Sequence, residues 1–557
     1  MDVKRLFLII SLALVSYLMV VQWNKDYGPQ AQAPVVQNTL PSEASSANDL
    51  VQEDIPQNST RGDLPNTSEA STSLIEVRTN VLDLRIDPKG GDIVFAALPQ
   101  HLAQVSTSNT PFVLLERSKV RTYVAQSGLA GVNGPDASRG GRPLFSAEKT
   151  TYELTEGENS LQVDLNYVQS TGVQITKRFT LQRDSYNIRV EYLVNNASSE
   201  TWSGYYFAQL KRDNSPDPTQ AEGMGMVSYL GAAISTVNEK YEKIKFEDIQ
   251  EADVKRESVG GWVAMIQHYF VSAWIPDQNV KQEYSTRSTS RGDNIVGFSS
   301  PETVLQPGEQ TTFGSNLYVG PKVQEQLESA APNLELTVDF GWLWFIAQPL
   351  FWMLNLLHGF LGNWGWSIII LTVMIKAAFF HLSASAYRSM ANMRRVGPEL
   401  QRMKEKYGED RQKMSQAMME LYKKEKINPI GGCLPILIQM PVFIALYWML
   451  MESVELRHAP FMLWIEDLSV KDPYFVLPII MGASMFIQQL LNPTPPDPMQ
   501  AKLMKALPVV FTVFFLWFPA GLVLYWVVNN VLSIAQQYVI TKRIESGSGD
   551  DDKKAKA

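Results

Sequence analysis

Hydrophobic and polar positions follow two different patterns in the two halves of this chain. Between residues 74 and 335, short runs alternate apolar and polar side chains and end at turn residues. Period-two alternation of this kind predicts an antiparallel β-sandwich with one dry face and one wet face. The clearest expected strands are residues 81–86, 161–167, 174–181 and 187–193. We therefore expect an all-β domain over residues 74–335.

Glycine pairs punctuate this β pattern at residues 90–91, 140–141 and 260–261. Glycine supplies the positive φ angles that tight turns need, so we interpret the pairs as turns rather than as ligand-binding loops. Residues 260–270 could line a pocket, but a packed strand is the better interpretation of this apolar stretch. The β region contains no metal-binding cluster, nucleophile elbow or phosphate loop in its sequence.

Long apolar stretches dominate the second half, and each is a candidate membrane-spanning helix. The stretches are residues 361–382, 430–451, 474–491, 507–518 and 522–540. The fourth of these is short for a span, which implies tilt, local thinning of the bilayer or protein shielding at one end. A break at Pro519-Ala-Gly521 separates the last two into a hairpin.

The N-terminus carries another apolar run, after Lys4 and Arg5. The nearest small-residue cleavage pattern lies too far beyond the run for an ordinary signal peptide, so residues 1–23 are predicted to form an uncleaved anchor. Residues 24–73 are rich in Pro, Ser, Asn, Gln and Asp and are predicted to be a flexible linker. With the five later stretches, six spans result.

An aromatic segment at residues 336–360 precedes these five stretches and contains Pro349. If it crossed the membrane, the basic loop that follows the next span would lie outside. A helix in the membrane interface, anchored by Trp342, Trp344 and Trp352, agrees better with the charge distribution.

Loop charges set the expected orientation. Residues 383–430 hold eleven Lys and Arg against six acidic residues, whereas residues 452–472 hold two against five. Because positive loops stay inside, both termini, the basic loop and the tail at residues 541–557 are predicted to be cytoplasmic, with the β domain outside. The net charge of −8 argues against DNA as a partner. The single cysteine, Cys433, excludes an intramolecular disulfide.

Lys376 is the most informative residue, because it is a cation inside the apolar stretch 361–382. A charge at such a position costs about 3 kcal/mol on insertion scales and usually marks a functional site. The alternative is that its long side chain reaches the headgroups. At helical spacing, Thr372 and Ser383 share its face.

A second polar stripe runs along the last apolar stretch, where Tyr525, Asn529, Ser533 and Gln537 recur every four residues. Two polar stripes should not face lipid. They either hydrogen-bond tightly to one another or line a wet cavity. Because Asp and Glu are absent from these stretches, Lys376 has no carboxylate of its own there and needs water, which favours a hydrated groove.

The basic loop at residues 383–429 is predicted to be a cytoplasmic helical hairpin. Its first helix is expected over residues 384–407, residues 408–410 form the turn, and a second helix follows. Methionines lie on the apolar faces of both helices: Met390, Met393, Met403, Met414 and Met418. These faces either pack on each other or offer an adaptable surface for varied apolar peptides.

Several ordered segments resemble the YidC family of bacterial membrane protein insertases. The resemblance is dense over residues 361–540 and looser through the β region. The strongest matches are Asn363-Trp-Gly-Trp-Ser, Lys426-Ile-Asn-Pro-Ile-Gly-Gly-Cys-Leu-Pro, Val454-Glu-Leu-Arg-His-Ala-Pro and Phe518-Pro-Ala-Gly-Leu.

This resemblance implies a periplasmic β-supersandwich and a five-helix core around a groove open to the cytoplasm and lipid. The family's positive groove residue is usually Arg, and this chain has Lys376 there; Lys keeps the charge but lacks the planar fork of Arg. Thr372 matches the family's polar groove residue, Trp526 a substrate contact beside Tyr525, and Asn529 a position where a hydroxyl is common.

The implied function is insertion and folding of new inner-membrane proteins, alone or with the Sec translocon. The implied partners are nascent membrane proteins, the translocon with its accessory subunits, the ribosome and membrane lipids. The resemblance implies neither a cofactor nor an enzymatic reaction. A transporter or channel with an intramembrane anion site around Lys376 is the alternative, although the sequence shows no charged rings or inverted repeats.

Overall fold

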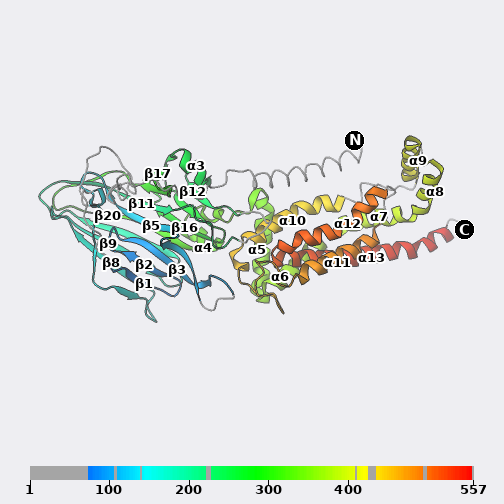
Figure 1. Ribbon diagram of the computed structural model, residues 1–557, viewed down its shortest axis with the longest axis horizontal. Coiled ribbons are helices and arrows are strands. Elements are labelled where there is room, and N and C mark those ends of the chain that lie inside the picture. Colours follow the sequence, from blue (N-terminus) through cyan, green and yellow to red (C-terminus); the bar gives the residue numbers. More distant parts are fainter. Residues whose placement is uncertain are drawn as a thin grey trace, which may run out of the picture. The chain divides into compact units, whose positions relative to one another are not determined.

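The computed structural model describes residues 73–105, 110–137, 141–220, 228–407, 410–424, 434–492 and 498–554 (Figure 1). The expected anchor at residues 1–23 lies outside the described residues, as does all but the last residue of the linker at 24–73. The described part divides into a β-rich region followed by a helical region (Figure 1).

The β-rich region is built from two large sheets. The 11-stranded sheet has the order β14 (Lys255–Val259), β17 (Lys281–Ser288), β18 (Asn294–Ser299), β11 (Trp202–Arg212), β5 (Thr122–Ala130), β4 (Pro111–Arg117), β3 (Asp92–Leu102), β2 (Asp83–Asp87), β1 (Ile75–Arg78) and β7 (Thr151–Glu153), with β19 (Thr303–Leu305) paired to β11. The 9-stranded sheet has the order β13 (Glu242–Ile244), β12 (Gly231–Ser235), β15 (Trp262–Ile266), β16 (Phe270–Pro276), β20 (Gln310–Pro321), β10 (Asn187–Asn195), β9 (Gln174–Gln182), β8 (Ser160–Val168) and β6 (Ser146–Ala147).

The expected alternation of buried and exposed positions is present in these strands. In β9, for example, Ile175, Phe179 and Leu181 are buried while their sequence neighbours are more exposed. Side chains on successive residues of a strand point to opposite faces, so the alternating sequence leaves one face in the core. The two sheets share one hydrophobic core, whose largest fully buried side chains include Trp202, Trp262 and Trp274.

Two details of the β region differ from the sequence expectation. Residues 260–270 do not form one strand: β15 ends at Ile266, and β16 starts at Phe270 after a tight turn closed by a 2.9 Å bond from the Gln267 amide to the Phe270 carbonyl. Both strands are buried throughout, and the polar pair Gln267-His268 between them marks the turn in the sequence. In addition, β1 and β7 pair in parallel, within an otherwise antiparallel pair of sheets.

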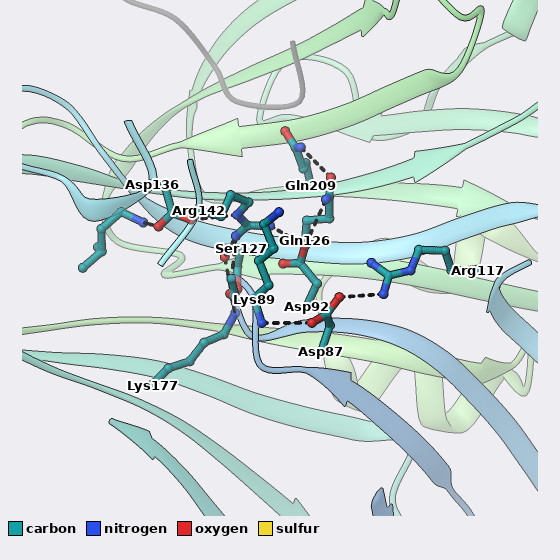
Figure 2. A network of polar contacts seen from close by, with 12 residues as sticks. Asp87, Lys89, Asp92, Arg117, Gln126, Ser127, Asp136, Arg142, Lys177 and Gln209 are labelled. Atoms are coloured by element: carbon teal, nitrogen blue, oxygen red, sulfur yellow. Dashed lines mark hydrogen bonds and ion pairs between the residues drawn. The ribbon is translucent and has the colours of Figure 1, made fainter. Parts of the chain in front are cut away.

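A charged network lies buried within the β region (Figure 2). The Arg142 guanidinium forms ion pairs with Asp92 and Asp136, and all three side chains are almost fully buried. The Lys177 ammonium donates to the carbonyl oxygens of Gly90 and Ser127 at 3.1 and 3.3 Å. Two cations therefore balance two carboxylates, which reduces the cost of removing these charges from water.

Helices form most of the remaining chain, with α3 (Phe246–Glu251) inside the β region. The others are α4 (Gln324–Ala330), α5 (Trp344–Leu361), α6 (Trp364–Ala378), α7 (Phe380–Arg395), α8 (Gly397–Tyr407), α9 (Arg411–Lys424), α10 (Leu434–Glu452), α11 (Val476–Leu491), α12 (Pro498–Phe514) and α13 (Ala520–Lys554). Short 3-10 helices are η1 (Pro135–Ala137), η2 (Leu334–Thr337), η3 (Gly341–Leu343), η4 (Val454–Leu456) and η5 (Phe515–Trp517). Helix α13 contacts α6, α7, α10 and α11, and so occupies the centre of the helical packing.

The helix that carries Lys376 ends earlier than expected. The apolar stretch 361–382 is divided into α6 and the start of α7, which meet at Phe379 with a bend of 67°. The expected helix 384–407 is likewise two helices, α7 and α8, separated at Val396. Pro398 explains this second break, because proline is tolerated in the first turn of a helix and not in its interior.

Two other helices are longer than their apolar stretches. Helix α12 begins at Pro498 although the apolar stretch begins at residue 507, and α13 continues to Lys554 although its stretch ends at residue 540. Apolarity marks only the part of a helix that avoids water, whereas backbone hydrogen bonding continues into polar sequence. The short fourth stretch is therefore part of a helix of ordinary length.

By length and apolar composition, one helix among the described residues suffices to cross a membrane, Gly341–Leu361, and a second if the bent pair α6 and α7 forms one span. Helix α11 is apolar but shorter. The first of these is the segment expected in the interface. It buries Ala347, Leu350, Phe351 and Leu354 on one side. Trp344 and Trp352 are exposed on another side, so its interfacial position stays a prediction.

Candidate functional site

Lys376 lies in the last turn of α6 and is buried, with only 9% of its surface exposed. Its ammonium donates to the Ser533 hydroxyl of α13 at 2.7 Å. That hydroxyl in turn donates to the Asn529 carbonyl at 2.7 Å. The serine can serve both groups because a hydroxyl has one donor and two acceptor sites. The side chain thus points into the helical packing and meets the polar stripe of α13.

No carboxylate among the described residues lies within ion-pair distance of the Lys376 ammonium. A buried cation normally has an anionic partner, because removing it from water costs several kcal/mol. One hydroxyl satisfies only one of its three donors. The site therefore holds a buried ammonium with two donors that have no partner among the described residues.

A third helix joins this site through Gln439 of α10. Its side-chain amide donates to the Asn529 side-chain oxygen at 2.6 Å. The same side chain lies near the buried Tyr525 hydroxyl. We did not predict Gln439 from the sequence, although a lone amide in the apolar stretch 430–451 was a usable signal. Polar side chains from α6, α10 and α13 thus converge in one region.

The structure separates some residues that the sequence placed on one face. The Thr372 hydroxyl is buried and donates to the Ile368 carbonyl of its own helix at 2.7 Å. Ser383 lies beyond the bend, on α7, so it does not continue the α6 face. Another α7 residue, Tyr387, approaches Ser533 instead. The 67° bend between α6 and α7 explains why Tyr387, rather than Ser383, approaches Ser533.

The residues of the polar stripe on α13 contact two different groups of helices. Tyr525, Asn529 and Ser533 meet α6 and α10, whereas the Gln537 amide donates to the Asn492 side-chain oxygen at 3.0 Å, just beyond α11. Gln537 therefore joins helices away from Lys376. Its role is that of a packing contact.

Trp526, beside the stripe, is half-buried between aromatic rings. Its ring lies edge-to-face against Phe443 with centroids 4.4 Å apart, and 5.4 Å from Phe515. The indole nitrogen is buried and has no acceptor among the described residues. Because a buried indole usually finds an acceptor, this donor is available to a bound group.

Some methionines of the predicted hairpin pack on a small hydrophobic cluster, and the others are half-buried. Helices α8 and α9 contact each other, and Met393 and Met403 pack on the cluster of Val396 and Leu421. The other three are half-buried: Met390, Met414 and Met418. The expected turn at residues 408–410 lies outside the described residues except for Asp410.

Two protein-family profiles match almost all of the chain after residue 73. The YidC periplasmic domain matches residues 74–353, and the 60Kd inner membrane protein family matches residues 356–547. The boundary between the two matches falls within α5 (Trp344–Leu361), after the last strand, β20, has ended at Pro321.

Full-length relatives are similarly close. Membrane protein insertase YidC of Stutzerimonas stutzeri is 56% identical over 98% of this chain and 100% of the relative. The protein of the same name from a Marinomonas species is also 56% identical, with the same coverage. A crystal structure of an active YidC insertase matches 84% of this chain and 93% of the crystallised chain, at 18% identity and a TM-score of 0.38. At these values it does not establish the family. On its sequence, the chain belongs to the YidC family of membrane protein insertases.

Proposed function

We propose that this insertase receives the polar segment of a new membrane protein in a hydrated groove centred on Lys376. The observation that carries the proposal is the buried Lys376 ammonium, bonded to Ser533 without a described carboxylate partner. Polar groups of Thr372, Tyr525 and Asn529 extend the groove. Trp526 is the proposed contact for the apolar part of the substrate.

Insertion needs no chemical step in this scheme. A polar segment must cross about 30 Å of hydrocarbon, where each unsatisfied polar group costs several kcal/mol. A wet indentation shortens that path, and the Lys376 charge attracts acidic residues of the substrate. Apolar segments then move along the outer helices into lipid, which gains about 25 cal/mol per Å² of apolar surface removed from water.

The proposed topology has six spans with both termini in the cytoplasm. The β region lies in the periplasm, α5 lies in the outer interface, and the α8–α9 hairpin faces the cytoplasm. Supporting this arrangement are the basic residues of the loop 383–430 and the exposed tryptophans Trp342, Trp344 and Trp352. The half-buried methionines of the hairpin would contact arriving apolar peptides.

The proposed partners are nascent membrane proteins, membrane lipids, the Sec translocon with its accessory subunits, and the ribosome. No enzymatic reaction or cofactor is proposed. A transporter or channel function is not favoured, because the close relatives are named as insertases.

Site-specific photo-crosslinking tests the groove directly. A photoreactive residue at Thr372 or Trp526 should capture a nascent membrane segment during insertion. Val531 provides a matched control, because it lies on the same helix as Trp526 but is 52% exposed on the outer surface. Stronger capture at Val531 than at both groove positions would reject the groove as the substrate's path.

A further inference from the structure

Three of the chain's five histidines gather where the β region meets the outer end of α10. His101 is in β3, His268 is in the turn between β15 and β16, and His458 follows η4. The other two, His358 and His381, lie in α5 and α7. This concentration joins parts of the chain that are far apart in sequence, and the proposed function leaves it unused.

His268 bonds the two regions in its neutral form. Its Nε2 atom lies 2.9 Å from the Met451 carbonyl of α10. A carbonyl only accepts, so Nε2 carries the proton, and the neutral ring has its lone pair on Nδ1. That Nδ1 atom is buried without a partner among the described residues. A second proton would therefore enter a site with no acceptor for it.

The charged groups around His268 are already engaged. The Glu452 carboxylate accepts from the Lys322 ammonium at 2.9 Å and from the Ser228 hydroxyl at 2.7 Å. Asp217 accepts from the His268 backbone amide at 2.6 Å. Lys322 opposes a positive imidazole while Glu452 and Asp217 favour it, and burial outweighs them all, so the pKa of His268 is lowered.

The other two histidines lie beside a fixed cation, Arg457. Its guanidinium donates to the Leu102 and Ala103 carbonyls at 2.7 and 3.1 Å, which ties the loop after α10 to the end of β3. Burial first, then Arg457 and His458, lower the pKa of His101 to about 4. Burial and Arg457 also lower the pKa of His458, against the Asp467 carboxylate 3.9 Å away.

We propose that this junction is an acid-sensitive latch, which holds the β region to the loop and the outer end of α10 while His101, His268 and His458 are neutral and loosens when they become protonated. The latch lies outside the proposed groove and does not depend on it. The periplasmic-domain profile covers its β side, so the pH that it meets is that of the external compartment.

Proton linkage gives the direction in which pH shifts the equilibrium between the closed and open forms of the junction. A histidine released from the junction has an ordinary pKa of about 6.5, which is higher than its pKa in the closed form. In acid, the open form therefore binds more protons than the closed form. The closed form is fully favoured above about pH 6.5 and loses its advantage as the pH falls toward 4. Because His101 is partly exposed, acidification from about pH 7.5 to 5 should raise the open-to-closed ratio on the order of tenfold.

Spin-label distance measurements on the full-length protein in lipid nanodiscs test the latch. Labels are placed on Val304→Cys in β19 and Met462→Cys in the loop after α10, in a Cys433→Ser background; both positions are exposed. At about pH 7.5 a single narrow distance is expected, and at about pH 5 a second, broader population. In the triple variant His101→Gln, His268→Gln, His458→Gln, the narrow distance should persist at both pH values.

The double variant His358→Gln, His381→Gln is the matched control and should respond to acid as the parent does. An unchanged distribution in the parent at about pH 5, or an equal response in the triple variant, overturns the proposal. If the triple variant shows the broad distance population at both pH values, the three single variants test whether the histidines cause the acid response. Each should then show less of the broad population in acid than the parent, and no reduction in any of them also overturns it.

Discussion

At the scale of single residues, two buried lysines are held in different ways. Lys376 in the helical region has one hydroxyl partner, at 2.7 Å. Lys177 in the β region has two carbonyl partners and lies over the rings of Phe179 and Tyr192. The fold thus occupies two of the three donors of Lys177 but only one of the three donors of Lys376, which leaves Lys376 more hydrogen-bonding capacity for a ligand.

The charge of Lys376 should matter more than its shape. We expect Lys376→Arg to preserve insertion and Lys376→Glu to weaken it several-fold, most for substrates with acidic translocated segments, because a carboxylate repels them. Insertion of model substrates into proteoliposomes measures this. Lys505→Glu, an exposed charge reversal in α12, is the control and should have little effect. Equal insertion by the Arg and Glu variants would contradict the role of the charge.

Lys177 should make the stability of the β region depend on pH. Burial lowers its pKa to about 7, from an ordinary 10.5. Between these values the unfolded chain binds a proton that the folded protein has lost, so stability rises with pH, by at most about 1.4 kcal/mol per unit. Denaturant unfolding at pH values across this window should show the rise in the parent and in exposed Lys149→Met. In Lys177→Met the rise should disappear, and a persisting rise would assign it to other groups.

At the scale of elements, α13 organises the site because it contacts α6, α7, α10 and α11. Its polar residues bond a different helix at each level: Asn529 meets Gln439 of α10, Ser533 meets Lys376 of α6, and Asn530 donates to Ser484 of α11 at 3.1 Å. Hydrogen bonds of this kind between membrane helices contribute about 0.6 kcal/mol each on average.

Gln439 should be needed to keep α10 and α13 in place. Gln439→Ala removes the partner of the Asn529 side-chain oxygen and a polar neighbour of the buried Tyr525 hydroxyl, so we expect a loss of about 1–3 kcal/mol in stability. Thermal unfolding in detergent measures it. Gln536→Ala is the control, because Gln536 makes only a 3.2 Å bond to the Phe380 carbonyl at the surface. A Gln439 variant as stable as the control would show that the bridge is dispensable.

Sequence pattern predicted elements better than it predicted their ends and partners. Alternation located β8, β9 and β10 because each buries one face. The bend at Phe379 carries neither Pro nor Gly, so no local signal marks it. Lys376 was visible as an isolated charge. Gln439 is likewise visible as a lone amide in the apolar stretch 430–451, but the sequence does not show its partner, Asn529, which lies 90 residues away.

At the scale of the whole molecule, the β and helical regions share a buried ion pair. Lys322 follows β20 and Glu452 ends α10, and their side chains are 1% and 2% exposed. The lysine also donates to the Thr337 carbonyl at 3.2 Å. Hydropathy could not predict this pair, because the two residues are 130 positions apart and each resembles an ordinary surface charge in its local sequence.

Removing one member of this ion pair should lower the stability of the protein more than removing both members. Glu452→Gln leaves the Lys322 ammonium buried without a counter-charge, at a cost of about 3–5 kcal/mol. The double variant Lys322→Met, Glu452→Leu should recover most of that loss, because both charges are then absent. Unfolding of the full-length protein measures all three. A double variant as unstable as the two single variants combined would mean that the pair contributes no coupling.

Water in the groove is the central requirement of the proposed mechanism, and thiol labelling measures it most directly. In a Cys433→Ser background, single cysteines replace Lys376, Asn529 and Val531, and a membrane-impermeant maleimide is added from the cytoplasmic side. Cysteines at 376 and 529 should react, whereas cysteine at 531, which is exposed on the outer surface of α13, should be protected by lipid. Protection at 376 and 529 equal to that at 531 would show that the helices pack dry around Lys376 and would contradict the account.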